Sequence, residues 1–185
     1  MRRPGQTALA TALVGFMLGS PGFSRDQDQD MSKIRLADRT LSLDLVLGAG
    51  PKPENRFRLP YAMAIDREGR IFVTDRGNRR VQIFDSEGQF VRTIGGRKNI
   101  GVRLSLPKSV ALDGFGNVYI GDRSARGARL VVIDRAGRLV KSLQVPFEAS
   151  SIGIVKDQLF IGTKETRSSA NIYFIGPDGN VARKI

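Results

Sequence analysis

The sequence predicts an all-β chain built from repeated four-stranded antiparallel sheets. Residues 59–94 return as residues 106–143, and Asp75 reappears 47 positions later as Asp122. Short runs rich in Val, Ile and Phe alternate with Gly, Asp and Pro, which is the pattern of strands and turns. The body of the chain shows no helical periodicity. A repeat of about 45 residues made of short strands is typical of β-propeller blades.

Each copy of the repeat is expected to hold four strands. In the first copy they lie at 62–66, 71–74, 81–84 and 90–94, and in the second at 109–113, 118–121, 130–133 and 139–143. A third, degraded copy places them at 151–155, 159–162, 172–175 and 181–185. Asp-x-x-Gly segments separate the strands, because Asp hydrogen-bonds its own turn and Gly adopts positive φ.

Two further features concern the ends of this array. Val155 and Thr163 stand in the third copy where the other copies have Asp. Residues 43–60 align without gaps to 90–107, so 43–47 is expected to be the outermost strand of a blade whose inner strands are missing.

The run Gly69–Asp75, followed by Asn78–Asp85 and Gly88, resembles an NHL repeat. The resemblance covers the propeller segment predicted over 43–185, with blades at about 59–94, 106–143 and 147–185. It implies a β-propeller of six blades, of which this sequence holds three, and a role in binding. Either further blades of a longer protein or a second chain would close the ring, and the spare strand at 43–47 favours the longer protein.

The N-terminal residues 1–24 are predicted to be a signal peptide. Arg2 and Arg3 precede a 12-residue apolar run, 8–19, which is too short to span a bilayer and forms a signal-peptide-like helix. A mitochondrial transit peptide is the alternative. Residues 25–42 then form a polar linker. The mature chain is therefore expected to be secreted or periplasmic, with no membrane span.

The amino-acid composition limits which metal sites and catalytic groups the chain can form. Cysteine and histidine are both absent, which removes thiolate and imidazole metal ligands and the most common general base. No nucleophile–base pair and no phosphate-binding Gly loop is visible. We therefore expect no cofactor, no metal and no enzymatic activity.

The net charge of +12 suggests an anionic partner. The family fold places the loops between second and third strands, and those between blades, on one face. These loops contain fifteen basic and five acidic residues, whereas the opposite turns contain eight acidic and five basic ones. The predicted ligand-binding residues are Arg76, Arg79, Arg80, Arg123, Arg126, Arg129, Lys164 and Arg167. Arg80 also has a simpler interpretation, as a brace for its loop through Asp75.

The function favoured by these patterns is that of a non-catalytic, exported binding module for an acidic protein, glycan or lipid headgroup. An RNA-binding NHL propeller is the first alternative, although the basic loops contain no aromatic residue for base stacking. A propeller lyase or hydrolase is the second.

Overall fold

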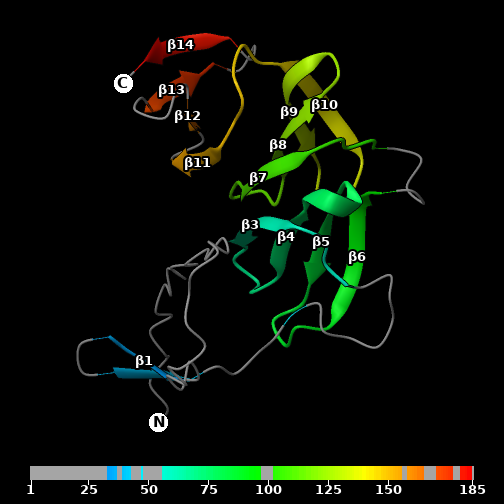
Figure 1. Ribbon diagram of the computed structural model, residues 1–185, viewed down its shortest axis with the longest axis vertical. Coiled ribbons are helices and arrows are strands. Elements are labelled where there is room, and N and C mark those ends of the chain that lie inside the picture. The colour runs from blue at the N-terminus through cyan, green and yellow to red at the C-terminus, as the bar shows by residue number, and fades with distance from the viewer. Residues whose placement is uncertain are drawn as a thin grey trace, which may run out of the picture. The chain divides into compact units, whose positions relative to one another are not determined.

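The computed structural model describes residues 33–36, 39–42, 47, 56–96, 102–155, 158–164, 170–176 and 180–184 (Figure 1). The predicted signal peptide lies outside these residues. The chain divides into two compact units, residues 1–44 and 45–185. In the first unit, β1 (Lys33–Leu36) and β2 (Arg39–Ser42) form an antiparallel hairpin that the sequence analysis did not predict. The predicted boundaries of the signal peptide and linker stay predictions.

The second unit holds three four-stranded antiparallel sheets, which we call the first, second and third blades. The all-β, partial propeller fold predicted from the repeat is thus confirmed. The first blade contains β3 (Pro60–Ile65), β4 (Ile71–Asp75), β5 (Arg80–Phe84) and β6 (Phe90–Gly95). The second contains β7 (Pro107–Leu112), β8 (Val118–Ser124), β9 (Gly127–Ile133) and β10 (Leu139–Gln144). The third contains β11 (Ser151–Val155), β12 (Gln158–Lys164), β13 (Ala170–Ile175) and β14 (Val181–Lys184).

The Asp-x-x-Gly segments form the expected turns. The Gly69 amide donates to the Asp66 carbonyl over 3.1 Å, and Gly69 has a φ of +80° that a residue with a side chain would rarely adopt. The Asp66 carboxylate accepts the Glu68 amide within the same turn. Asp113 and Gly116 repeat this arrangement in the second blade, so the turn chemistry read from the sequence is confirmed.

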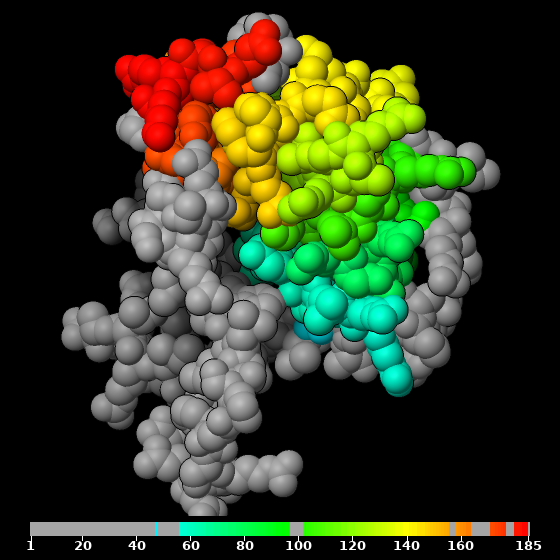
Figure 2. All heavy atoms as spheres, turned by 45° about the horizontal axis from the view of Figure 1, so that its top comes forward, coloured from blue at the N-terminus to red at the C-terminus, as the bar shows by residue number. Residues whose placement is uncertain are grey.

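Successive blades bury apolar side chains between them. Side chains on a strand point alternately to the two faces of a sheet. One face of the first blade, with Phe72 and Ile83, packs against Val118 and Ile120 of the second blade. The other face of the second blade packs in the same way against the third, and the innermost strand β7 lies beside both β3 and β11 (Figure 1). Figure 2 shows the three blades following one another in chain order.

The remaining face of the first blade carries a third apolar cluster. Ile71, Val73 and Phe84 are buried there, and Leu47 and Phe57 pack against them. Leu47 belongs to the segment predicted to be an outer strand over 43–47, whose other residues lie outside the described ones. Its position in this cluster matches that of Ile94, its counterpart 47 residues later, in the cluster between the first and second blades.

Candidate functional site

A buried carboxylate lies at or near the end of the second strand in each of the first two blades. Asp75 is fully buried at the end of β4. One of its oxygens, Oδ1, accepts the Arg58 amide over 2.7 Å. The other, Oδ2, accepts from the Arg80 Nε over 2.8 Å and from the Asn78 side chain over 2.8 Å. Asp75 therefore fastens the segment that enters the blade to the loop between β4 and β5.

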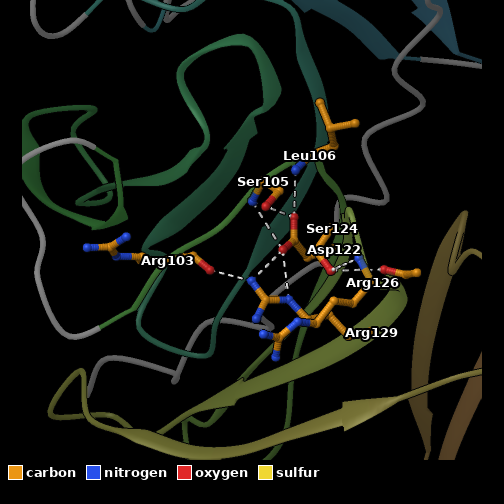
Figure 3. A network of polar contacts seen from close by, with 8 residues as sticks. Arg103, Ser105, Leu106, Asp122, Ser124, Arg126 and Arg129 are labelled. Carbon is orange, nitrogen blue, oxygen red and sulfur yellow. Dashed lines mark hydrogen bonds and ion pairs between the residues drawn. The ribbon is translucent and has the colours of Figure 1, made fainter.

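Asp122 repeats this arrangement at the same point in the second blade (Figure 3). Its Oδ1 accepts the amides of Ser105 and Leu106 over 2.9 and 2.7 Å. Its Oδ2 accepts both Nε and Nη2 of Arg129. The Arg129 Nη2 also donates to the Arg103 carbonyl. Both carboxylates are thus occupied by structural hydrogen bonds from backbone amides and neighbouring side chains.

We call Asp75 and Asp122, with the groups that bind them, the carboxylate clamps. They hold the basic loops at one edge of the blades. The Gly77 amide donates to the Arg58 carbonyl over 2.7 Å, and the Gly96 amide donates to the Arg79 carbonyl over 3.0 Å. The loop between β4 and β5 thereby contacts the segments before and after its own blade. We call this edge the arginine loop face and define it as residues 56–60, 75–80, 102–108, 122–129 and 145–148.

The predicted site residues divide into two groups on this face. Arg80 and Arg129 form internal ion pairs with the clamps, each with an N–O distance of 2.8 Å, and Arg80 is only 13% exposed. The interpretation of Arg80 as a brace is therefore confirmed, and Arg129 is a second brace. Arg79, Arg123 and Arg126 are exposed.

Arg76 and the third-blade residues stand apart from both groups. Arg76 lies in the short 3-10 turn η2 (Arg76–Asn78), which the sequence analysis did not predict. It is partly buried, and its Nε has no hydrogen-bond partner among the described residues. The side chain of Lys164, and Arg167 as a whole, lie outside what the structure describes.

Arg79 has an unusual backbone. Its φ of +56° and ψ of +42° lie in the left-handed region, where a residue with a side chain costs about 1 kcal/mol. Leu59 on the same face has a φ of +53° and is 67% exposed. Strained backbone of this kind is concentrated at functional sites. Sequence patterns alone gave no sign of either conformation.

Glu148 is the third acidic residue of the arginine loop face. Its carboxylate forms an ion pair with the Lys108 Nζ at 2.6 Å and lies 3.5 Å from the Arg123 Nη1. Burial is the largest single influence on Glu148 and favours its neutral form. The hydrogen bond and charge of Lys108, with the charge of Arg123, together outweigh burial and hold the pKa of Glu148 below its ordinary value. Lys108 also lies 5.9 Å from the centre of the Tyr61 ring.

The arginine loop face consequently has an excess of positive charge. Among its described residues, ten are basic and three are acidic. All three acidic side chains are engaged by internal partners. Arg79 and Arg126, in contrast, extend from the loops as exposed cations. The positive potential of this face therefore comes from exposed side chains, which a binding partner in solution can reach.

The opposite edge, which we call the turn face and define as residues 66–70, 85–89, 113–117 and 134–138, has a different charge pattern. Its acids and bases pair with each other, as in Arg70 with Asp66 at 2.6 Å and Arg135 with Glu68 at 3.0 Å. Two shallow cavities of about 270 and 370 Å³ open beside this face. Asp113 lines both, but its carboxylate already accepts from Phe115, Asn117 and Tyr119.

Neither face holds an evident catalytic or metal constellation among the described residues. Within them, no three acidic, His or Cys side chains lie close enough to hold a metal ion. The same residues include no helix that is long and apolar enough to cross a membrane.

The comparisons with known proteins agree with the repeat pattern. A family model of the NHL repeat matches residues 57–84. NHL repeat-containing protein 3 of Homo sapiens is 42% identical over 40 residues, which cover 22% of this chain and 11% of that protein. The matched stretch is thus a small part of that relative.

Two solved structures share the fold. A protein of Bacteroides fragilis NCTC 9343, described as exported, superposes with a TM-score of 0.56 at 14% identity, covering 73% of this chain and 39% of that one. A streptogramin B lyase superposes with a TM-score of 0.52 at 13% identity, covering 83% of this chain and 47% of that one. The present chain spans less than half of either structure, and at these identities the likeness concerns the fold alone.

Proposed function

The chain is an NHL-repeat protein with a β-propeller fold, and from this premise we propose that it is a non-catalytic, exported module that binds an acidic protein through its arginine loop face. The observation that carries the proposal is that the acidic side chains on that face are paired, whereas several of its arginines are exposed. The clamps and Lys108 engage its three acids, while Arg79 and Arg126 extend into solvent and Arg123, although 3.5 Å from Glu148, keeps a side chain that is 59% exposed. An uncompensated surface of one sign attracts and orients a partner of the other.

Arginine suits this role because its guanidinium binds a carboxylate through two parallel hydrogen bonds. The three exposed arginines lie in, or directly beside, the connections between the second and third strands of two neighbouring blades. Cations spread over two loops match an extended acidic segment better than a small anion. The cavities beside the turn face do not contribute to this surface.

Apolar side chains on the same face favour a protein partner over a glycan. Leu59 is 67% exposed, and its counterpart Leu106 in the second blade is 38% exposed. An acidic peptide with interspersed apolar residues would cover both kinds of surface. Export follows from the signal-peptide-like N-terminus and is part of the proposal.

The test uses two immobilised peptides of equal charge: poly-glutamate, and an acidic peptide with leucine at every third position. We expect both peptides to bind, the leucine-containing one more tightly. The affinity of both should fall as the salt concentration rises from 50 to 500 mM, because salt screens interactions between exposed charges, with a screening length of about 10 Å at 0.1 M. Replacing Arg79, Arg123 and Arg126 by Ala should weaken binding at least tenfold, and Leu59→Ser should remove the preference for the leucine-containing peptide.

A control lies on the turn face, where Arg67, Arg135 and Arg138 are also exposed, the last two in ion pairs with Glu68 and Asp134. Replacing these three by Ala changes the net charge by the same amount and should leave binding nearly unchanged. Equal losses from the two triple variants would show non-specific attraction by net charge and would contradict the proposal.

A further inference from the structure

Two arginines of the first blade lie beside Gly77 on the arginine loop face. Arg58 is exposed, and its side chain passes over Gly77, where a Cβ would lie 2.5 Å from the Arg58 Cγ. Arg76 directly precedes Gly77 in η2 and is partly buried. The Asp75 carboxylate accepts the Arg58 amide, and the Arg58 carbonyl accepts the Gly77 amide. The fold therefore fixes the backbone of two like charges on either side of one glycine.

The Arg76 guanidinium has donors without acceptors. Its Nε is buried and has no hydrogen-bond partner among the described residues. Its two Nη groups are not enclosed in this way, and they too make no hydrogen bond within the described part of the chain. A buried donor without a partner is costly and rare in folded proteins. Four other arginines donate their Nε to an Asp carboxylate: Arg70, Arg80, Arg129 and Arg138.

The internal repeat shows which kind of group satisfies such an arginine. Arg123 is the counterpart of Arg76 47 residues later, and it lies 3.5 Å from the Glu148 carboxylate. Strand register makes Glu148, at the entry to the third blade, the counterpart of Leu106 at the entry to the second. The junction between the second and third blades thus has an acid at the position where the junction between the first and second has a leucine.

We propose that Arg58 and Arg76 form a carboxylate subsite within the arginine loop face, filled by a carboxylate of the acidic partner. The inference rests on the proposed function and names the group that the partner contributes at this point. The partner carboxylate accepts from Arg58 and from the accessible Nη groups of Arg76, in the manner of a charge-assisted hydrogen bond. No acid of the chain itself has to be displaced, because Leu106 stands where the next junction has Glu148.

Partial burial makes this subsite stronger than a fully exposed arginine. A side chain that the fold already holds loses less conformational freedom when a partner binds. Leu59 lies opposite Arg76, because Pro60 pairs with Asp75 in antiparallel register, and it is 67% exposed. Aliphatic surface beside the cations excludes water from an ion pair formed there, which strengthens it. The subsite therefore fits an acidic residue that has an apolar neighbour.

Single substitutions separate this subsite from the general charge of the face. Arg76→Ala should weaken binding of the leucine-containing acidic peptide about tenfold. Arg79→Ala is the matched control, because it removes the same charge from an exposed side chain three residues away, and it should weaken binding only about twofold. Arg76→Ala should leave the free energy of unfolding unchanged or higher, because the Arg76 side chain has no partner in the unbound chain.

A peptide with an amidated C-terminus identifies the source of the carboxylate. Unchanged affinity would assign a side-chain carboxylate of the peptide to the subsite. A loss as large as that from Arg76→Ala would assign the C-terminal carboxylate. Both results agree with the proposal, because the subsite recognises the same group in either case.

A second experiment supplies the acid from within the chain. Leu106→Glu places a carboxylate where the next junction has Glu148, so it should pair with Arg76, fill the subsite and weaken peptide binding about tenfold. Leu106→Gln has the same size without the charge and should keep binding within about threefold. At pH 7 the Glu variant should unfold at a higher urea concentration than the Gln variant. Adding Arg76→Ala to both should abolish that difference, a result that requires no partner.

The outcomes distinguish this subsite from the proposed function. Acidic peptides that bind the natural chain, but lose no more affinity from Arg76→Ala than from Arg79→Ala, would overturn the subsite alone. Destabilisation by Arg76→Ala, or equal urea midpoints for Leu106→Glu and Leu106→Gln, would also overturn it, because Arg76 would then have no vacant place for a carboxylate. Failure of both acidic peptides to bind the natural chain would overturn the proposed function and the subsite together.

Discussion

The Lys108 ammonium and the Glu148 carboxylate form a 2.6 Å ion pair that joins the inner strand of the second blade to the segment leading into the third. Their side chains are 18% and 27% exposed, so water screens the pair only in part. Arg123 adds a second cation to the same carboxylate. This three-residue contact holds the connection between two blades at the arginine loop face.

We expect Glu148 to make stability depend on pH in the acid range. Its folded pKa lies below its ordinary value of 4.5, so it stabilises the fold fully above that value and loses the contribution as the pH falls through the folded pKa. Urea unfolding of the natural chain and of Glu148→Gln should differ by about 0.5–1 kcal/mol at pH 6. The difference should shrink as the pH falls below 4.5 and vanish once Glu148 is protonated in the folded chain, and a constant difference from pH 6 to 3 would contradict this account.

The clamp carboxylates should be far more important to stability than the exposed arginines. Asp122→Ala leaves Arg129 without its partner and two backbone amides unsatisfied, so we expect a loss of about 3 kcal/mol or more in the free energy of unfolding. Arg126→Ala, at an exposed position four residues after Asp122, should change the free energy of unfolding by less than about 0.5 kcal/mol. Urea denaturation measures both, and similar losses would show that Arg126 is structural too.

Arg79 is expected to trade stability for binding. Arg79→Gly relieves the left-handed backbone and should leave the unfolding free energy unchanged or raise it by up to about 1 kcal/mol. The same substitution removes an exposed cation and should weaken binding to the acidic peptides. Thermal unfolding and peptide binding are measured on one sample, with Arg80→Ala as the comparison that should lose stability because it breaks the Asp75 ion pair.

Gly121 should be intolerant of even one added carbon. A Cβ there would meet the Ser109 hydroxyl and lie 2.8 Å from the Ala149 Cβ, in the buried contact between the second and third blades. We expect Gly121→Ala to lower the unfolding free energy by about 1–3 kcal/mol. Gly114→Ala is the control, because a Cβ there meets only the flexible end of Arg67. Equal effects would mean that backbone entropy, and not crowding, decides the result.

The repeat made the fold predictable, because each strand and turn was marked twice and a third time weakly. The brace formed by Arg80 and Asp75 was also within reach, since the two residues stand at the two ends of one short loop, between β4 and β5. Other features depend on how the connections between blades run, which no periodic pattern records. Neither the bond from Arg129 to the Arg103 carbonyl nor the left-handed Arg79 could be foreseen for that reason. Glu148 has two cationic partners that lie far from it in the sequence and meet it only in the fold.

The third blade replaces both members of the clamp at once. Thr163 stands where the other blades have Asp75 and Asp122, and its register partner Asn171 stands where the second blade has Arg129. Because the acid and the base are both absent, neither leaves an unpaired buried charge. The contact that holds the entering segment to the loop in the other two blades is absent as well. We therefore expect the C-terminal sheet to open first in native-state hydrogen exchange, as a separate cooperative unit. A partner that covers this sheet would slow hydrogen exchange of its amides, because binding would then oppose its local opening.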